Sequence, residues 1–154
     1  MASLISTKEV IVTGATGFIG QHLVPLLLTN GYRVTAVARN EDKASAISWF
    51  KDVNFVRLDI NQKTNDLSLP GEGRLIHLAW DGLPNYQSQH HVDENLPGSY
   101  EFLKSLIERG LRQLLVAGTC FEYGGLTGAI KSSAPCNPRT RYGHAKNALH
   151  QQLR

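Results

Sequence analysis

The sequence has few cysteines and lacks any long hydrophobic run. Cys120 and Cys136 are its only cysteines, too few for a disulfide framework or a four-cysteine zinc site, so we expect free thiols and a reducing, cytoplasmic setting. No apolar stretch reaches the roughly 20 residues of a membrane span. Residues Met1 to Lys8 lack the basic and apolar regions of a signal peptide. We therefore expect a chain that neither crosses nor enters a membrane.

Charge of one sign is not concentrated in the sequence either. The 16 Lys and Arg exceed the 13 Asp and Glu by three. They are scattered, with neither a basic stripe nor interleaved aromatics, which argues against a nucleic-acid partner. The 154 residues are 42% hydrophobic and 19% charged, which is typical of a globular domain that needs no disulfide or metal to fold. An anionic small molecule is the expected partner.

Short β-branched runs alternate with longer helical patterns, which predicts βαβ units around a parallel sheet. Strands are expected at 9–13, 33–38, 53–58, 75–79 and 114–117. Helices are expected at 18–29, where Pro25 should kink the helix, at 41–50 after an Asn40 cap, at 92–109 and from Tyr142 onward. Residues 61–73 are polar and rich in turn-forming residues, so any helix there is expected to be brief. Residues 123–140, rich in Gly, Ser and Pro, are expected to form a long loop.

Three glycines follow the first expected strand, in the segment Thr13-Gly-Ala-Thr-Gly-Phe-Ile-Gly20. Between a strand and a helix, the first glycine permits a tight turn, the second lets the backbone approach phosphate, and the third lets helix and strand pack. This context favours nucleotide binding over glycines that only form a turn. The expected contacts are Gly14, Thr16, Gly17, Phe18, Ile19 and Gly20. The Gly-x-x-x-x-Gly-Lys-Ser/Thr pattern is absent, so NTP hydrolysis has no support.

The glycine segment resembles the opening of the extended short-chain dehydrogenase/reductases, the family of nucleotide-sugar epimerases, dehydratases and 4-ketoreductases. Further matches follow in the family's order, at Asp59-Ile60, His77-Leu78-Ala79, Thr119 with Tyr123-Gly124, and Tyr142-Gly-His-Ala-Lys146. The resemblance implies a nucleotide-sugar substrate and an NAD(P) cofactor contacted by Asp59, Ile60, Leu78, Ala79 and Lys146.

The family is about twice as long as this chain and carries further strands and a C-terminal substrate domain. The last helical pattern also has no stop signal, because Leu149 and Leu153 are still in register near its end. We therefore expect a chain truncated before those strands.

Tyr142 and Lys146 are four residues apart on an expected helix, so both side chains project from one face. Tyrosine is a poor acid or base near neutrality because its pKa is about 10, and a neighbouring ammonium stabilises the phenolate. Thr119, at the carboxyl end of the fifth strand, offers a hydroxyl to the sugar oxygen. Alone, a Tyr-x-x-x-Lys pair is more often an ordinary surface helix. Together with the glycine loop, the three residues are predicted to be catalytic.

Cys120 and Phe121 stand where, by the resemblance, sugar dehydratases carry the Asp-Glu pair that eliminates the C6 hydroxyl. Epimerisation or keto reduction at C4 is therefore expected. Glu122 is expected to be structural or solvated, and Cys120 to be a small buried residue rather than a nucleophile. Trp80 either lines the sugar pocket or fills the core, and both alternatives stay open.

The prediction is thus an α/β fold, with residues 1–154 forming one NAD(P)-binding Rossmann-type domain, a doubly wound parallel sheet in strand order 3-2-1-4-5. The parent protein is expected to be a nucleotide-sugar 4-epimerase or 4-ketoreductase. The alternative is a non-catalytic dinucleotide-binding module or an inactive truncated fragment.

Three lesser expectations concern the cofactor, metals and assembly. Arg39 stands about 20 residues past the glycine loop, where NAD enzymes carry an acidic residue. Arg39 predicts NADP as the cofactor, unless its side chain only stacks on adenine or points to solvent.

No metal is expected, because the adjacent pair His90-His91 and the single His77 lack a carboxylate cluster at ligand spacing. A homodimer is expected through an exposed apolar stripe of the last two helices, formed by Phe102, Leu106, Leu149 and Leu153.

Overall fold

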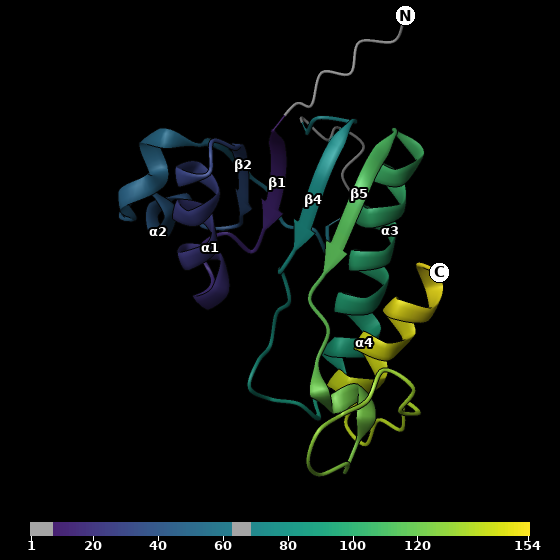
Figure 1. Ribbon diagram of the computed structural model, residues 1–154. Coiled ribbons are helices and arrows are strands. Elements are labelled where there is room, and N and C mark those ends of the chain that lie inside the picture. Colours follow the sequence, from purple (N-terminus) through teal and green to yellow (C-terminus); the bar gives the residue numbers. More distant parts are fainter. Residues whose placement is uncertain (1–7, 63–68) are drawn as a thin grey trace, which may run out of the picture. The chain divides into compact units, whose positions relative to one another are not determined.

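The computed structural model describes residues 8–62 and 69–154 and contains a five-stranded parallel sheet (Figure 1). The strands are β1 (Glu9–Thr13), β2 (Arg33–Ala38), β3 (Asn54–Arg57), β4 (Gly73–His77) and β5 (Leu111–Val116). Their order is β3-β2-β1-β4-β5, and every neighbouring pair is parallel. The predicted fold class and strand order are confirmed, with strand ends that differ by a few residues.

The helices follow the predicted places but are more broken than expected. They are α1 (Phe18–Thr29), α2 (Glu41–Ser45), the 3-10 turn η1 (Ser48–Asp52), the π-helical turn η2 (His91–Asn95), α3 (Leu96–Glu108), the 3-10 turn η3 (Cys120–Tyr123) and α4 (Arg141–Gln152). Asn40 caps α2 as predicted, since its side chain accepts from the Lys43 N–H at 2.8 Å. The single helix expected at 41–50 is wrong, because Ile47 adopts an extended conformation between α2 and η1. Residues 61–73, where any helix is expected to be brief, fall partly outside the described residues.

Two compact units make up the chain. The first contains all five strands with α1, α2 and η1, and the second contains Trp80–Ser105 and Ala117–Arg154, and so η2, η3 and α4. Among residues 8–62 and 69–154, no helix is both long and apolar enough to span a bilayer.

One face of the sheet packs against α1 and η1 in the first unit. The cluster consists of β-branched and small residues from the strands together with Val24 and Trp49, and it includes Val10, Val12, Val34 and Ala36. Strand residues that point the other way, such as Ile11 and Leu75, are also buried. Burial on both faces explains why the strands read as continuous apolar runs rather than alternating ones.

We predict that Leu75→Ala will cost about 2–5 kcal/mol of unfolding free energy, because it empties a buried site in β4. Leu75 is 1% exposed, whereas Leu115 on β5 is 58% exposed. Leu115→Ala is therefore the matched control and should cost about 0.5 kcal/mol or less. Urea unfolding of both variants measures the difference. Equal losses would contradict the packing described for β4.

Candidate active site

The glycine loop of the first unit leaves no room for side chains at two of its glycines. Gly14 has a φ of +67°, and a Cβ there would come within 2.8 Å of the Ala79 nitrogen. A Cβ at Gly20 would collide with the carbonyl oxygens of Gly14 and Ala15. The loop is closed by a hydrogen bond from the Gly17 N–H to the Gly14 oxygen at 2.9 Å. Glycine is thus required for the turn after β1 and for the packing of α1 on it.

The N-terminus of α1 has the features of an anion site. Gly17 is its N-cap, no side chain caps the helix, and no acidic residue lies in the first turn. Phe18 and Ile19 are 81% and 57% exposed, so they do not cover this end. Uncapped N–H groups and the helix dipole favour a phosphate beside such a loop. The residues present therefore fit the pyrophosphate of a dinucleotide.

Thr13 and His77 are two residues whose role sequence reasoning missed in this unit. Both are fully buried. The Thr13 hydroxyl oxygen accepts from the backbone N–H groups of Leu78 and Ala79 at 3.2 and 3.3 Å, and it lies 2.9 Å from Nδ1 of His77. Because the hydroxyl has one proton and already accepts twice, it donates to Nδ1. The pair fixes the backbone of Leu78 and Ala79 against the glycine loop.

The remaining predicted cofactor residues lie at the carboxyl edge of the same sheet. Arg39 directly follows β2 and is exposed, and Asp59 follows β3 and is half-buried. Leu78 and Ala79 follow β4. Ligands of such sheets bind at this edge. Ile60 belongs to the second unit.

Tyr142 lies among aromatic rings in the second unit. Its side chain is 8% exposed. The ring centroid lies 5.3 Å from that of His91 and 5.7–5.9 Å from those of Trp80, Tyr86 and Phe121. Offset and edge contacts of this kind hold a ring in one orientation. The hydroxyl of Tyr142 is therefore presented in a fixed place.

Thr119 lies close to Tyr142, because η3 packs against α4. Burial raises the pKa of the Tyr142 hydroxyl above its ordinary 10.0, while a hydrogen bond with the Thr119 side chain acts in the opposite direction. Thr119 is the N-cap of η3 and accepts from the Phe121 N–H at 3.3 Å. The turn after β5 therefore determines where the threonine hydroxyl lies.

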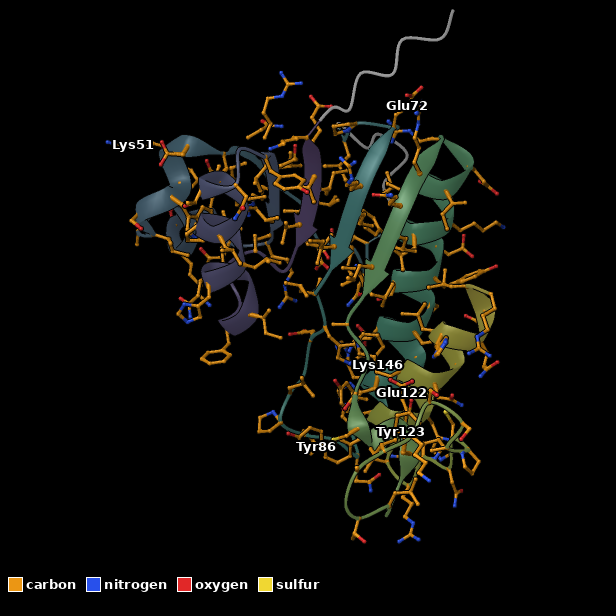
Figure 2. The ribbon with its side chains drawn as sticks, in the orientation of Figure 1. Lys51, Glu72, Tyr86, Glu122, Tyr123 and Lys146 are labelled. Carbon is orange, nitrogen blue, oxygen red and sulfur yellow. The ribbon has the colours of Figure 1, made fainter. Side chains whose placement is uncertain are left out.

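Lys146 is a buried cation one helical turn after Tyr142 (Figure 2). Its side chain is 4% exposed, and its Nζ donates to the Ala117 carbonyl at 2.8 Å. Nζ also lies 4.2 Å from the centre of the Trp80 ring, a cation–π contact. Burial lowers the pKa of Lys146 from 10.5 to about 8, with Glu122 opposing the change. At neutral pH the ammonium form therefore predominates.

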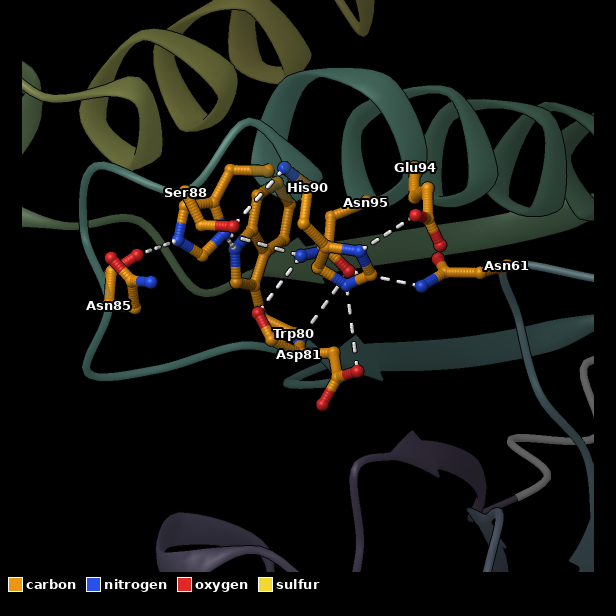
Figure 3. Close-up of polar contacts among 9 residues, drawn as sticks. Asn61, Trp80, Asp81, Asn85, Ser88, His90, Glu94 and Asn95 are labelled. Carbon is orange, nitrogen blue, oxygen red and sulfur yellow. Dashed lines mark hydrogen bonds and ion pairs between the residues drawn. The ribbon is translucent and has the colours of Figure 1, made fainter.

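A buried polar network holds Trp80 in place (Figure 3). The indole N–H donates to Nδ1 of His91 at 3.1 Å, and Nε2 of His91 lies 2.8 Å from the Asn85 carbonyl oxygen. Because an indole nitrogen only donates and a carbonyl only accepts, His91 is neutral with its proton on Nε2. Asn95, four residues later on η2, donates to the Asp81 carbonyl at 2.9 Å. The half-buried Trp80 ring lies against Tyr142 and Lys146, and both roles left open for it stay predictions.

The histidines considered for a metal have other partners. His77 is bonded to Thr13 and His91 to Trp80, while His90 lies 3.1 Å from Glu94 and 3.5 Å from Asp81. Within the described part of the chain, no group of three His, Cys, Asp or Glu residues is arranged to hold an ion.

Two expectations about burial are wrong. Cys120 is exposed rather than buried, because the first residue of η3 faces outward. Phe102, Leu106 and Leu149 are 6%, 0% and 1% exposed, so they do not form the exposed apolar stripe on which a homodimer was expected. The rest of the chain already covers them. The homodimer stays a prediction without that support.

We predict that Lys146 gives the free energy of unfolding a distinctive pH dependence. Between its folded pKa of about 8 and its ordinary 10.5, the unfolded chain binds a proton that the folded chain lacks, so stability should rise with pH through this range. Across this whole range the free energy of unfolding should rise by about 3 kcal/mol. Tyr142, whose pKa is raised, opposes it only above pH 10. Urea unfolding from pH 7 to 10 should show the rise, and a Lys146→Met chain with the same slope would contradict it.

The chain is similar to known proteins both in sequence and in fold. A family model described as the NAD dependent epimerase/dehydratase family matches residues 10–154. The dTDP-6-deoxy-L-talose 4-dehydrogenase (NAD(+)) of Aggregatibacter actinomycetemcomitans is 38% identical over 149 residues, which cover 94% of this chain and 54% of that protein. The UDP-glucose 4-epimerase of Halalkalibacterium halodurans is 27% identical over 152 residues, covering 94% and 45%.

A solved structure of MoeE5 in complex with UDP-glucuronic acid and NAD is 27% identical, with a TM-score of 0.73, and is covered over 48% of its chain and 94% of this one. The chain spans about half the length of the curated relatives it matches. Since the family model extends over nearly the whole chain, this protein belongs to the NAD-dependent epimerase/dehydratase family.

Proposed function

We propose that the protein is an NAD(P)-dependent enzyme acting at C4 of a nucleotide sugar, as a 4-epimerase or as a 4-keto-6-deoxyhexose reductase. One observation carries the proposal: α4 carries Tyr142 and the buried Lys146 one turn apart, and it packs against η3, the turn that Thr119 caps. The enzymatic names of the relatives and the glycine loop of the first unit support it.

The proposed chemistry assigns one task to each of the three residues. The Tyr142 oxygen takes the proton of the C4 hydroxyl, or returns it to a C4 carbonyl. The Lys146 ammonium stabilises the phenolate, which burial alone would disfavour. Thr119 orients the sugar oxygen and the tyrosine toward each other. The cofactor, when bound, supplies or accepts hydride at the nicotinamide, once in a reductase and twice in an epimerase.

The residues after Thr119 distinguish this reaction from dehydration. Cys120 is an exposed thiol and Phe121 stacks on Tyr86, with ring centroids 4.5 Å apart. Neither can act as the carboxylic acid or carboxylate that elimination of a C6 hydroxyl requires. Oxidation, reduction or inversion at C4 needs no carboxyl group at these two positions, and is therefore the reaction we propose.

Tyr142→Phe tests the acid/base assignment. The change removes one oxygen and keeps the ring packing, so turnover should fall about 100-fold to 10,000-fold while cofactor affinity stays nearly unchanged. Lys146→Ala should reduce both. The measurement is oxidation of NADPH or NADH with a nucleotide-linked 4-keto hexose. Turnover that survives in Tyr142→Phe would refute the assignment, and cofactor binding with no turnover in the unsubstituted chain would favour a binding module.

The cofactor we propose is NADP, with NAD as the alternative because the dehydrogenase relative and the MoeE5 complex are named with NAD. The exposed Arg39 directly follows β2 and can pair with a 2′-phosphate. It stands where NAD enzymes carry an acidic residue that binds the ribose 2′-hydroxyl. We predict tighter binding of NADPH than of NADH in a fluorescence titration, and loss of most of that difference in Arg39→Ala. Equal affinities, or tighter NADH, would make NAD the cofactor.

A further inference from the structure

Glu122 is a buried carboxylate in the catalytic unit that the proposed chemistry does not use. Its exposed fraction is 5%. One oxygen accepts from the Thr119 N–H at 2.7 Å, which completes a capping box on η3. The other lies 3.6 Å from Nδ1 of His150, whose side chain is 48% exposed. A Cβ at Gly118 would come within 3.0 Å of the first oxygen, so the chain is closely fitted around this group.

Capping alone does not require a charge at this position. Glutamine completes a capping box as glutamate does, because only an acceptor oxygen is needed. A buried carboxylate costs several kcal/mol of desolvation unless a cation compensates it. His150 is a weak compensation, because it is half exposed and is charged only when protonated. The glutamate charge therefore calls for a further partner.

Lys146 is a buried cation of the same unit whose direct contacts are uncharged groups. It is 4% exposed, and its Nζ contacts the Ala117 carbonyl and the Trp80 ring, both uncharged. Lys146 precedes His150 by one helical turn on α4, and η3 packs against α4 in this unit. Figure 2 labels Lys146 and Glu122 in the same part of the second unit.

We propose that Glu122 is a positioning residue for the catalytic set, which holds Thr119 by its cap and keeps Lys146 charged beside Tyr142. Only the link between this charge and catalysis rests on the proposed function. The electrostatic part concerns the chain itself and does not depend on any substrate.

The direction of one pKa change agrees with this role, because Glu122 raises the pKa of Lys146 against the larger lowering by burial. The same charge raises the pKa of Tyr142 and so opposes the phenolate, which the Lys146 ammonium has to offset. The other titratable groups around the pair are His91 and Tyr86 beside Tyr142, Cys120 on η3, and His150 on α4. Of these groups, Glu122 alone shifts the pKa of Lys146. Removing its charge should let the ammonium lose its proton at a lower pH.

Glu122→Gln in the 154-residue chain tests the proposal, because it keeps the capping oxygen and removes the charge. The readout is the pH titration of the Lys146 side-chain NMR signal, assigned by its loss in Lys146→Met. We expect the pKa of Lys146 to move downward from about 8. Glu101→Gln, at an exposed site on α3, makes the same change in net charge and should leave that titration in place.

Glu122→Asp separates charge from capping and guards against a glutamine variant that does not fold. It keeps the negative charge and weakens the cap, so Lys146 should titrate near its original pKa. An unchanged Lys146 titration in Glu122→Gln, or a fall of the same size in Glu122→Asp, would overturn the proposal. If Glu122→Gln does not fold, Glu122→Ala, which also removes the charge, takes its place in the comparison with Glu122→Asp. Because no substrate is involved, a negative result here is distinct from an absence of C4 chemistry.

Discussion

The second unit is organised around one costly feature, an ammonium group removed from water. Lys146 has no solvent to hydrate it, so the protein supplies the face of an indole and a backbone carbonyl. Each of these must itself be held. The indole is fixed by His91, and the carbonyl belongs to the segment that leads from β5 into the η3 turn. Much of the polar network of this unit therefore supports a single positive charge.

The first unit is organised by backbone rather than by charge. Its central strands β1 and β2 are buried on both faces, so polar groups collect where the strands end. There the Thr13 hydroxyl binds the two amides that follow β4, and the absence of a Cβ at Gly14 lets the same amides approach the loop. A phosphate site built from main-chain N–H groups needs this kind of support, because the direction of each N–H group is set by the backbone conformation alone.

Sequence reasoning succeeded where periodicity and local chemistry decide the structure. The parallel sheet and its order follow from buried strands alternating with helices, and the cap of α2 follows from Asn40. It failed where distant residues decide. A helical pattern shows that Phe102 and Leu149 each lie on the apolar face of a helix, but not that the same chain covers those faces. The bond between Trp80 and His91, the π-helical turn at His91 and the burial of Glu122 have no local signal.

The hydrogen bonds of His91 have a consequence for proton movement near Tyr142. An imidazole whose ring centre lies 5.3 Å from that of the tyrosine would ordinarily compete with it as a base. Here the basic nitrogen faces the indole N–H and the other nitrogen faces a carbonyl. The His91 ring therefore takes no part in the proposed proton transfer. It lies beside Tyr142, but its hydrogen bonds leave it no free lone pair that could accept the proton.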